Sequence, residues 1–381
     1  MKLIFASDSF KGTISSERAA ELLSKAAREV FGNCETRNVL IADGGEGTTD
    51  AVIRARNGER IYVTVHGPLM EPLRTYFGKL SGSEAVLEMA RASGLPLVPK
   101  EKRNPLITTT FGTGEMVKAA LDMGFRDISI AIGGSATNDG GMGFARALGV
   151  RFLDSDGNSL EGCGRDLEKV FRIDMSGLDA RVKETRFTVM CDVTNPLCGK
   201  NGAARTFGPQ KGASPEIVER LERGMRNYRD VIVRTFGVNP EDIPGSGAAG
   251  GLGAALAVFF GAAMQSGIET VLNIIQFDDI LKEAGLVVTG EGRADRQSGC
   301  GKVLQGVGDR ARAHGVPAVA IVGSLGPGYE CVYEHGIESV LPAVDSPMSL
   351  DEALARAEEL YEKAALRLFR LVKVGMGLHG K

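Results

Sequence analysis

The sequence of 381 residues contains no tryptophan and only four histidines. His66 abuts a turn, His314 and His335 lie near helix ends or loops, and His379 lies in the tail, which disfavours catalysis led by a histidine acid or base. No G-x-S-x-G elbow occurs, so the usual setting of a Ser–His–Asp triad is missing as well. The six cysteines form no C-x-x-C pair and show no zinc spacing, and we interpret them as free thiols.

Charge of one sign and long apolar runs are also scarce. The formal net charge is −3, which gives no support for a nucleic-acid partner. The most apolar run, Ala248 to Met264, is short and rich in glycine and alanine, which favours a buried helix over a membrane span. We expect no signal peptide in the first residues, because their apolar run is short and charge appears by Asp8. We therefore expect a cytoplasmic protein with no membrane partner.

Generic nucleotide-binding motifs do not explain the sequence. No G-x-x-x-x-G-K-[ST] segment occurs, which excludes a P-loop enzyme. The stretch GSGAAG, Gly245 to Gly250, matches G-x-G-x-x-G but follows NPEDIP rather than a strand. A dinucleotide-binding turn is therefore not expected there.

Glycine is abundant, with 51 residues that cluster directly after apolar runs. Such clusters predict sharp turns from strands into helices. Short apolar runs, as in KLIFASDS and LVVTGEG, alternate with segments of helical length, which is typical of α/β proteins with parallel sheets. After KLIFASDS we expect a helix with Ser15 or Ser16 as its N-cap and Gly32 as its stop, and we expect the strand in RIYVTVHGP to end at the Gly67-Pro68 break. We expect an open doubly wound (Rossmann/flavodoxin-like) α/β domain, residues 1–68 plus 285–381, interrupted by an inserted second α/β domain, residues 69–284. In such an arrangement the active site is expected in the cleft between the domains.

Polar side chains gather in five segments that each follow an apolar run: ASDSFKG, ADGGEGT, GGSATNDGG, CDVTNPLCG and TGEGRADRQSGCGK. Together they supply carboxylates, lysines, arginines, small hydroxyls and glycine amides. Oxygen ligands suit Mg²⁺, while Lys and Arg neutralise phosphate charge, so the set favours a site for Mg²⁺ with a phosphate compound. Gly133, Gly134 and Ser135 of the third segment would cradle phosphate with their backbone amides.

The segments DSFKGT, ADGGEGT, RNPLITTTFGTGEM, IGGSATNDGG, FGPQKGA, GAAGGLGAAL and TGEGRADRQSGCGK resemble, in order, the signature blocks of the bacterial type-1 glycerate kinases. The resemblance extends from Asp8 to about Lys302. It implies ATP-dependent phosphorylation of D-glycerate, in many members to 2-phosphoglycerate, with ATP and Mg²⁺ as cofactors. Thr194 stands where the family commonly has Asp, and Ser298 where it commonly has Thr.

The resemblance implies in-line phosphoryl transfer, and the site residues are assigned on that basis. Asp192 would accept the hydroxyl proton, with Lys11 and Arg293 as further catalytic residues. The expected substrate-binding residues are Asp8, Asp43, Arg103, Asn195 and Asp295. The expected nucleotide- or phosphate-binding residues are Gly133, Gly134, Ser135, Asn138, Glu291 and Lys302, and the candidate Mg²⁺ ligands are Asp43 and Asp295.

Three alternatives stay open at this point. The phosphate could go to the 3-hydroxyl of glycerate, or the enzyme could be an ATP-dependent ligase that activates a small carboxylate. A sensor that binds a hydroxy acid without catalysis is the third. Lys211 is open between a solvated loop lysine and a ligand contact, and the chain could be a monomer or a homodimer.

Overall fold

The computed structural model describes residues 1–10, 12–42, 44–45, 47–296 and 302–379. It divides the chain into two compact units. Residues 1–43 and 268–381 make the first unit, and residues 44–267 make the second. Each unit is built on its own parallel or mostly parallel sheet, so the expectation of an α/β fold with parallel sheets is confirmed.

The first unit holds a five-stranded sheet in which every neighbouring pair is parallel. Its order is β15-β13-β11-β1-β2, the strand order of flavodoxin-like sheets. The strands are β1 (Lys2–Ser7), β2 (Glu35–Asn38), β11 (Leu286–Gly290), β13 (Ala318–Val322) and β15 (Ile337–Pro342). A further short pair is β12 (Arg293–Ala294) with β14 (Ser324–Leu325). The helices are α1 (Ser16–Phe31), α9 (Gly267–Ile274), α10 (Phe277–Leu281), α11 (Val303–Ala313), α12 (Leu350–Ala355) and α13 (Ala357–His379).

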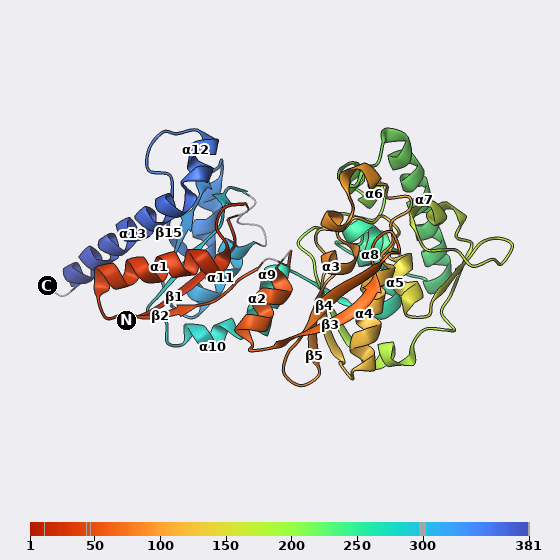
Figure 1. The fold of residues 1–381 in the computed structure, drawn as a ribbon, viewed down its shortest axis with the longest axis horizontal. Coiled ribbons are helices and arrows are strands. Elements are labelled where there is room, and N and C mark those ends of the chain that lie inside the picture. The colour runs from red at the N-terminus through yellow and green to blue at the C-terminus, as the bar shows by residue number, and fades with distance from the viewer. Residues whose placement is uncertain (11, 43, 46, 297–301, 380–381) are drawn as a thin grey trace. The chain divides into compact units, whose positions relative to one another are not determined.

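Helices α1 and α13 lie side by side on one face of this sheet (Figure 1). Their apolar residues join Leu3 and Phe5 of β1 in one core cluster. Helix α1 begins where the sequence predicts, because the Ser15 hydroxyl accepts a hydrogen bond from the Arg18 amide. It ends at Gly32, whose φ of 68° is in the left-handed region that favours glycine.

The second unit is built on a six-stranded mixed sheet of order β10-β9-β6-β5-β4-β3. Strands β5, β6, β9 and β10 are parallel, whereas β3, β4 and β5 form antiparallel pairs. The strands are β3 (Glu59–His66), β4 (Pro72–Lys79), β5 (Glu84–Glu88), β6 (Asp127–Ala131), β9 (Arg186–Met190) and β10 (Ala263–Gln265), with a separate pair β7 (Arg151–Leu153) and β8 (Arg172–Asp174). The helices are α2 (Thr48–Ala55), α3 (Ala90–Ser93), α4 (Phe111–Asp122), α5 (Met142–Ala147), α6 (Ala203–Phe207), α7 (Pro215–Phe236) and α8 (Ala248–Phe260).

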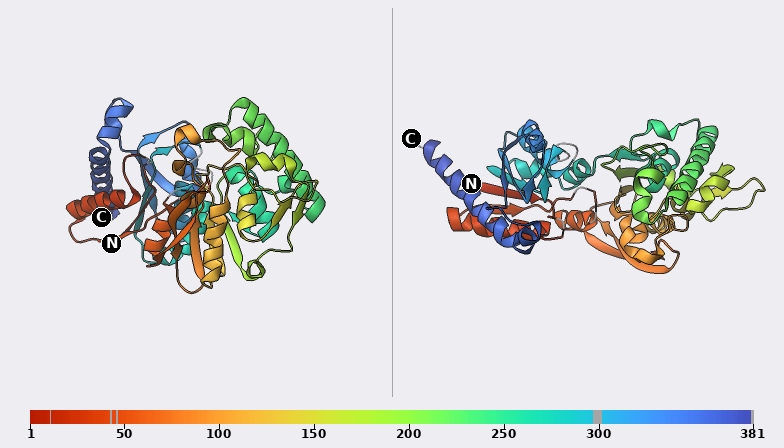
Figure 2. Two further views of the ribbon diagram at one scale, coloured as in Figure 1. Left: turned by 45° about the vertical axis from the view of Figure 1, so that its right-hand side comes forward. Right: turned by 90° about the horizontal axis from the view of Figure 1, so that it is seen from above.

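The long helix α7, green in Figures 1 and 2, packs against α6 and against the short 3-10 helix of residues 164–169. Helix α8 carries the most apolar run of the sequence and lies almost entirely in the core, as the sequence predicts. No helix in the described part of the chain is both long and apolar enough to cross a membrane.

The division between the units corrects the expected boundaries at residues 68 and 285. Strand β3 pairs with β4 along its whole length, from Glu59 opposite Lys79 to His66 opposite Pro72. The Gly67-Pro68 break is therefore a hairpin turn, closed by the Gly67 amide donating to the Glu71 carbonyl at 2.7 Å. Residues 44–68 accordingly belong to the second unit, while α10 and nearly all of α9 belong to the first.

Candidate functional site

A pocket of about 490 Å³ opens at the carboxyl edge of the sheet in the first unit. Four of its lining residues directly follow strands of that sheet: Asp8 after β1, Glu291 after β11, Gly323 after β13 and Ala343 after β15. Ligands of open parallel sheets bind at this edge, because the loops after neighbouring strands converge there. The pocket thus has the position expected of a binding site.

Backbone hydrogen bonds fix the strand-end loops around the pocket. The Asp8 amide donates to the carbonyl of Gly290, the last residue of β11, at 2.9 Å. The Gly323 amide donates to the Glu291 carbonyl at 3.1 Å. The Asp8 carboxylate accepts a hydrogen bond from the Ser9 amide at 2.6 Å. The two carboxylates, Asp8 and Glu291, are therefore carried on loops that are tied to the sheet.

The cationic side of the pocket comes from the segment after β11. Arg293 lies on β12, and its guanidinium is 3.6 Å from the Asp295 carboxylate. A side chain at Gly326 would stand 2.8 Å from both Arg293 and Asp295, so glycine there lets the two residues pack against the backbone. Lys302 lines the same pocket directly before α11. Asp8, Glu291, Arg293, Asp295 and Lys302, all predicted from sequence as site residues, are brought together here.

The remaining wall of the pocket is apolar and was not predicted. It consists of residues from α12 and the first turns of α13, with Phe10 and Tyr361 beneath them in an edge-to-face contact of 4.9 Å between ring centroids. The Tyr361 hydroxyl lies 3.4 Å from the Ser7 hydroxyl, and burial raises the pKa of Tyr361. A phenol in this setting stays neutral and serves the packing of the wall.

The second unit has its own convergence of loops, at the carboxyl ends of β6 and β9. Gly133 and Gly134 follow β6 and are exposed, and Gly134 has a φ of 74°. A side chain at Gly133 would approach Gly45 to 3.4 Å, and one at Gly44 would approach Gly267 to 3.0 Å. These glycine-rich loops therefore pack backbone against backbone.

Asp192 lies in the same part of the second unit, in the loop after β9, and is exposed. Its Oδ1 accepts hydrogen bonds from the Gly267 amide at 2.8 Å and the Ser266 hydroxyl at 3.1 Å. These two donors hold one carboxylate oxygen in place. Thr194, which replaces the family's usual Asp, is exposed in the same loop.

Other predicted site residues of the second unit have structural partners. The Arg103 guanidinium donates to the Val98 carbonyl at 3.4 Å, and the Asn195 amide donates to the Asn201 carbonyl at 2.8 Å. Ser135 is buried and forms a bridge with Gly94. Asn138 is completely buried, so its side chain lies in the core rather than on a surface that a nucleotide could reach.

The buried part of the glycine loop belongs to a cluster of polar residues that the sequence alone did not predict. Asp139 is fully buried and accepts hydrogen bonds from the Thr110 amide and hydroxyl at 2.7 and 2.8 Å and from the Gly141 amide at 3.0 Å. Burial raises the pKa of Asp139, and these donors oppose that rise. Lys211 is buried beside it, donates to the Thr137 carbonyl at 2.7 Å, and has a pKa lowered by burial to about 7. Lys211 is thus a residue of the core in this structure.

Glu88 is a second buried acid that the sequence analysis did not single out. It ends β5, is only 2% exposed, and accepts hydrogen bonds from the Thr49 amide at 2.6 Å and the Gly47 amide at 3.3 Å. Burial raises the pKa of Glu88, and the positive charge of Arg91 opposes this rise. Its signal in the sequence is an acidic residue at the end of the apolar run EAVLE. It caps α2 and so orders the start of the helix that follows the ADGGEGT segment.

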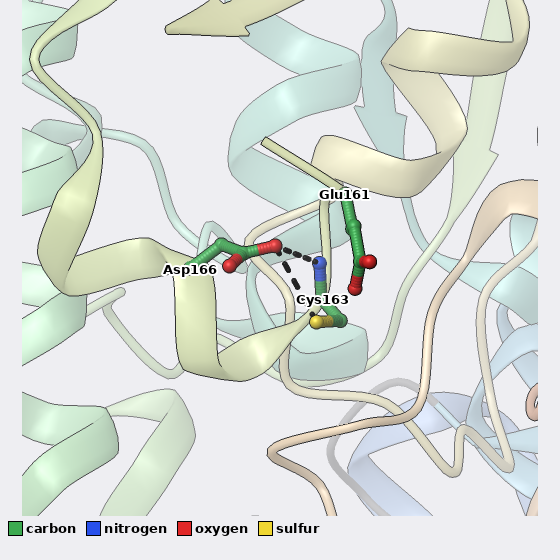
Figure 3. Close-up of side chains that lie close together, drawn as sticks. All are labelled: Glu161, Cys163 and Asp166. Carbon is green, nitrogen blue, oxygen red and sulfur yellow. Dashed lines mark hydrogen bonds between the residues drawn. The ribbon is translucent and has the colours of Figure 1, made fainter. Parts of the chain in front are cut away.

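Glu161, Cys163 and Asp166 form the one group of three metal-ligand types found among the described residues (Figure 3). An Asp166 oxygen accepts hydrogen bonds from the amide and the thiol of Cys163, both at 3.4 Å, and caps the short helix of residues 164–169. Burial raises the pKa of Cys163 to about 12, so its sulfur is a thiol in this structure. Cys163 and Asp166 thus form a helix cap, and Glu161 pairs with Arg165. The five cysteines that the structure describes are free, as predicted.

Two predicted site residues, Lys11 and Asp43, lie outside the described residues, as does Ser298. The predicted roles of Lys11 and Asp43 therefore stay predictions. Of the two candidate Mg²⁺ ligands, only Asp295 is described, and it lines the pocket of the first unit.

Comparison with known proteins identifies the family. The profile of the glycerate kinase family matches residues 3–373. A glycerate kinase of Halalkalibacterium halodurans is 47% identical over 95% of this chain and 96% of its own length. A glycerate 2-kinase of Escherichia coli is 44% identical over 99% of both chains. The crystal structure of a protein assigned as glycerate kinase 2 from Salmonella typhimurium LT2 is 42% identical, covers 99% of both chains and superposes with a TM-score of 0.87. The chain therefore belongs to the glycerate kinase family, whose members are phosphotransferases acting on an alcohol group.

Proposed function

We propose that the protein transfers the γ-phosphoryl group of ATP to the 2-hydroxyl of D-glycerate and releases 2-phosphoglycerate and ADP. The observation that carries this proposal is the pocket of the first unit, where Asp8, Glu291 and Asp295 lie with Arg293 and Lys302. Cations neutralise the charge of transferring phosphates, and carboxylates hold the metal that accompanies them. The E. coli relative named glycerate 2-kinase supports the choice of the 2-position.

Phosphoryl transfer depends more on positioning and charge neutralisation than on covalent catalysis. Arg293 and Lys302 would neutralise phosphate oxygens, and Lys11 would join them. A planar guanidinium can bind two oxygens at once, which gives Arg293 a role in orientation as well as charge. Gly133 and Gly134, which are exposed in the second unit, would supply their backbone amides as further anion donors.

The donor set of the pocket fits Mg²⁺. Among the described residues, no three carboxylates of this pocket gather within ligand distance of one another. Mg²⁺ in kinases is commonly held by one or two carboxylates plus the substrate phosphates, so a larger protein cage is not needed. Asp295, together with Asp43, would hold the ion, which supplies positive charge to the phosphate oxygens when bound.

Asp192 is proposed as the base that accepts the hydroxyl proton of glycerate. Its Oδ1 is already fixed by the Gly267 amide and the Ser266 hydroxyl. Asp192→Asn keeps an oxygen for both donors but removes the charge and the basicity. We expect kcat to fall by about 10²–10⁴-fold with little change in stability. Asp230→Asn, at an exposed carboxylate paired with Arg229, is the matched control and should leave kcat unchanged.

The test is ADP release from Mg-ATP with D-glycerate, with the position of the new phosphate assigned by ³¹P NMR. Formation of the 2-phosphate that collapses in Asp192→Asn supports both the reaction and the base. Formation of the 3-phosphate would show that glycerate binds in the opposite orientation. Full activity of Asp192→Asn would show that another residue is the base. Capture of an acyl hydroxamate with hydroxylamine would indicate a ligase, because a phosphate ester does not react in this way.

A further inference from the structure

The apolar wall of the pocket in the first unit has no part in the phosphoryl chemistry proposed above. Its residues are Leu350, Ala353 and Leu354 of α12 with Ala357 and Leu360 of α13. Leu350 and Leu354 are four residues apart and share a face of the helix. Their exposed fractions are 73% and 47%. None of the residues of α12, all of which the structure describes, is buried. Two leucines of the wall, Leu350 and Leu354, thus stay in contact with water.

D-Glycerate does not account for this wall. It is a small acid with an oxygen on every carbon, so it has no apolar face that would cover a leucine side chain. The pocket volume of about 490 Å³ lies in the range of sites for cofactors and other larger ligands. A nucleoside base, in contrast, is a flat ring with two apolar faces, and burying such a face against leucine and alanine is favourable.

The topology of the sheet points to the same ligand. Strand order reverses at β1, which has β2 on one side and β11 on the other. Nucleotides bind to open α/β sheets at this switch point, outside the carboxyl ends of the strands. Asp8 directly follows β1 and Glu291 directly follows β11, so the pocket lies at the switch point.

We infer that this pocket is the nucleotide site, with the base of ATP against Leu350 and Leu354 and its phosphates toward Arg293 and Lys302. The inference rests on the proposed function, because it takes ATP as the phosphoryl donor. It assigns nucleotide recognition to α12 and the start of α13, outside the segments that carry the family resemblance. It also means that the base of ATP does not bind at the glycine loop around Gly133, so that this loop contacts anionic groups only.

The absence of tryptophan from the sequence provides a direct test. Leu350→Trp places the only indole of the chain on the wall, at a position that is largely exposed. Stacking of a base on this indole should quench its emission when Mg-ATP is added, and D-glycerate alone should not. Leu371→Trp is the matched control, because Leu371 is 64% exposed on α13 but does not line the pocket. Its emission should not respond to Mg-ATP.

Leu354→Glu tests the wall by function. A carboxylate on the wall should raise the KM for ATP at least about tenfold, while the KM for D-glycerate changes little. Inhibition by tripolyphosphate, which has the phosphates but no base, should be unchanged. Leu371→Glu should behave as wild type in all three measurements.

The outcomes separate this inference from the proposed function. Unchanged emission of Leu350→Trp in a sample that converts ATP and D-glycerate would place the base elsewhere and leave the kinase activity standing. If Leu354→Glu lost affinity for ATP and for tripolyphosphate equally, the wall would have a structural role and no contact with the base, and the inference would be wrong. No turnover and no binding of Mg-ATP by the wild type, measured by calorimetry, would remove the proposed function and the inference with it.

Discussion

The buried lysine of the second unit makes the stability of the protein depend on pH in an unusual direction. Lys211 is only 2% exposed, and its ammonium donates to the Thr137 carbonyl at 2.7 Å beside the ring of Phe207. Burial lowers the pKa of Lys211 from 10.5 to about 7, and Asp139 opposes the shift only in part. Replacing the lysine by methionine keeps a long side chain of similar shape and removes the titration.

The sign of the effect follows from proton binding. Between pH 7 and pH 10.5 the unfolded chain keeps the proton on Lys211, whereas the folded chain releases it. The unfolded state thus binds more protons, and the free energy of unfolding rises with pH across this window. With these two pKa values, linkage gives a gain of about 2 kcal/mol between pH 7 and pH 9. Below pH 7 both states are protonated and the contribution is constant.

Lys211→Met should not show this gain. The variant also leaves the Thr137 carbonyl without its donor, which costs about 1–3 kcal/mol at every pH and does not change the slope. The difference between wild type and variant should therefore grow in favour of the wild type by about 2 kcal/mol from pH 7 to pH 9.

Amide hydrogen exchange in α7 and α8 measures the second unit alone, since both helices belong to it. The ratio of exchange rates in wild type and variant at one pH cancels the intrinsic dependence of exchange on pH. Lys100→Met, at an exposed lysine of the same unit, is the control and should give the same ratio at both pH values. If Lys211→Met also gives a constant ratio, the lysine titrates as it does in water and the argument from burial is wrong.

Three further predictions concern the second unit. Gly250→Ala should lower the free energy of unfolding by about 3 kcal/mol, because its φ is 67° and a Cβ would stand 2.1 Å from the Thr137 carbonyl. Gly315→Ala is the control: Gly315 has the same φ and open space around it, so the free energy of unfolding in urea should fall by only about 1 kcal/mol. Equal losses in the two variants would show that the contact with Thr137 is unimportant. Asp139→Asn should lower the free energy of unfolding by about 3 kcal/mol or more, because it puts a donor where a buried acceptor faces N–H donors. An unchanged midpoint of urea unfolding would contradict the role of this buried polar cluster. Cys163, with its pKa raised to about 12, should stay unmodified by a thiol-reactive disulfide at pH 8 until urea is added, and rapid modification of the native protein would show that the helix cap opens.

The fold could be predicted where the signals are local. The apolar runs at Lys2–Ser7 and Leu286–Gly290 became strands, and Ser15 and Gly32 became the ends of a helix. The boundary between the units could not be read in this way. The Gly67-Pro68 break marks a turn, but a turn alone does not say whether the strand before it pairs with earlier or later chain. Here the pairing is with β4, which draws residues 44–68 into the second unit.

The candidate site shows the same division. Acidic and basic residues directly after apolar runs, such as Asp8 and Glu291, could be predicted to meet because parallel strands share a carboxyl edge. Asn138 and Asp139 have the same sequence signal but are buried, because Gly140 and Gly250 let two backbones meet over them. The contact between Gly140 and Gly250 joins residues far apart in the sequence, so no local pattern predicts it.

The apolar wall is the part of the pocket that sequence could least reveal. Leu350 and Leu354 have the spacing of an ordinary amphipathic helix, which normally predicts a face covered by the protein itself. Only the structure shows that this face is uncovered. A folded protein that leaves leucines exposed beside a pocket gives up the favourable burial of that surface unless a ligand restores it. In the first unit, cations and carboxylates at the strand ends suit a phosphate chain, and the leucines suit a base, so both halves of a nucleotide are matched within one pocket. The second unit offers Asp192 and the exposed Gly133 and Gly134, which are features that suit a small acid bearing hydroxyls.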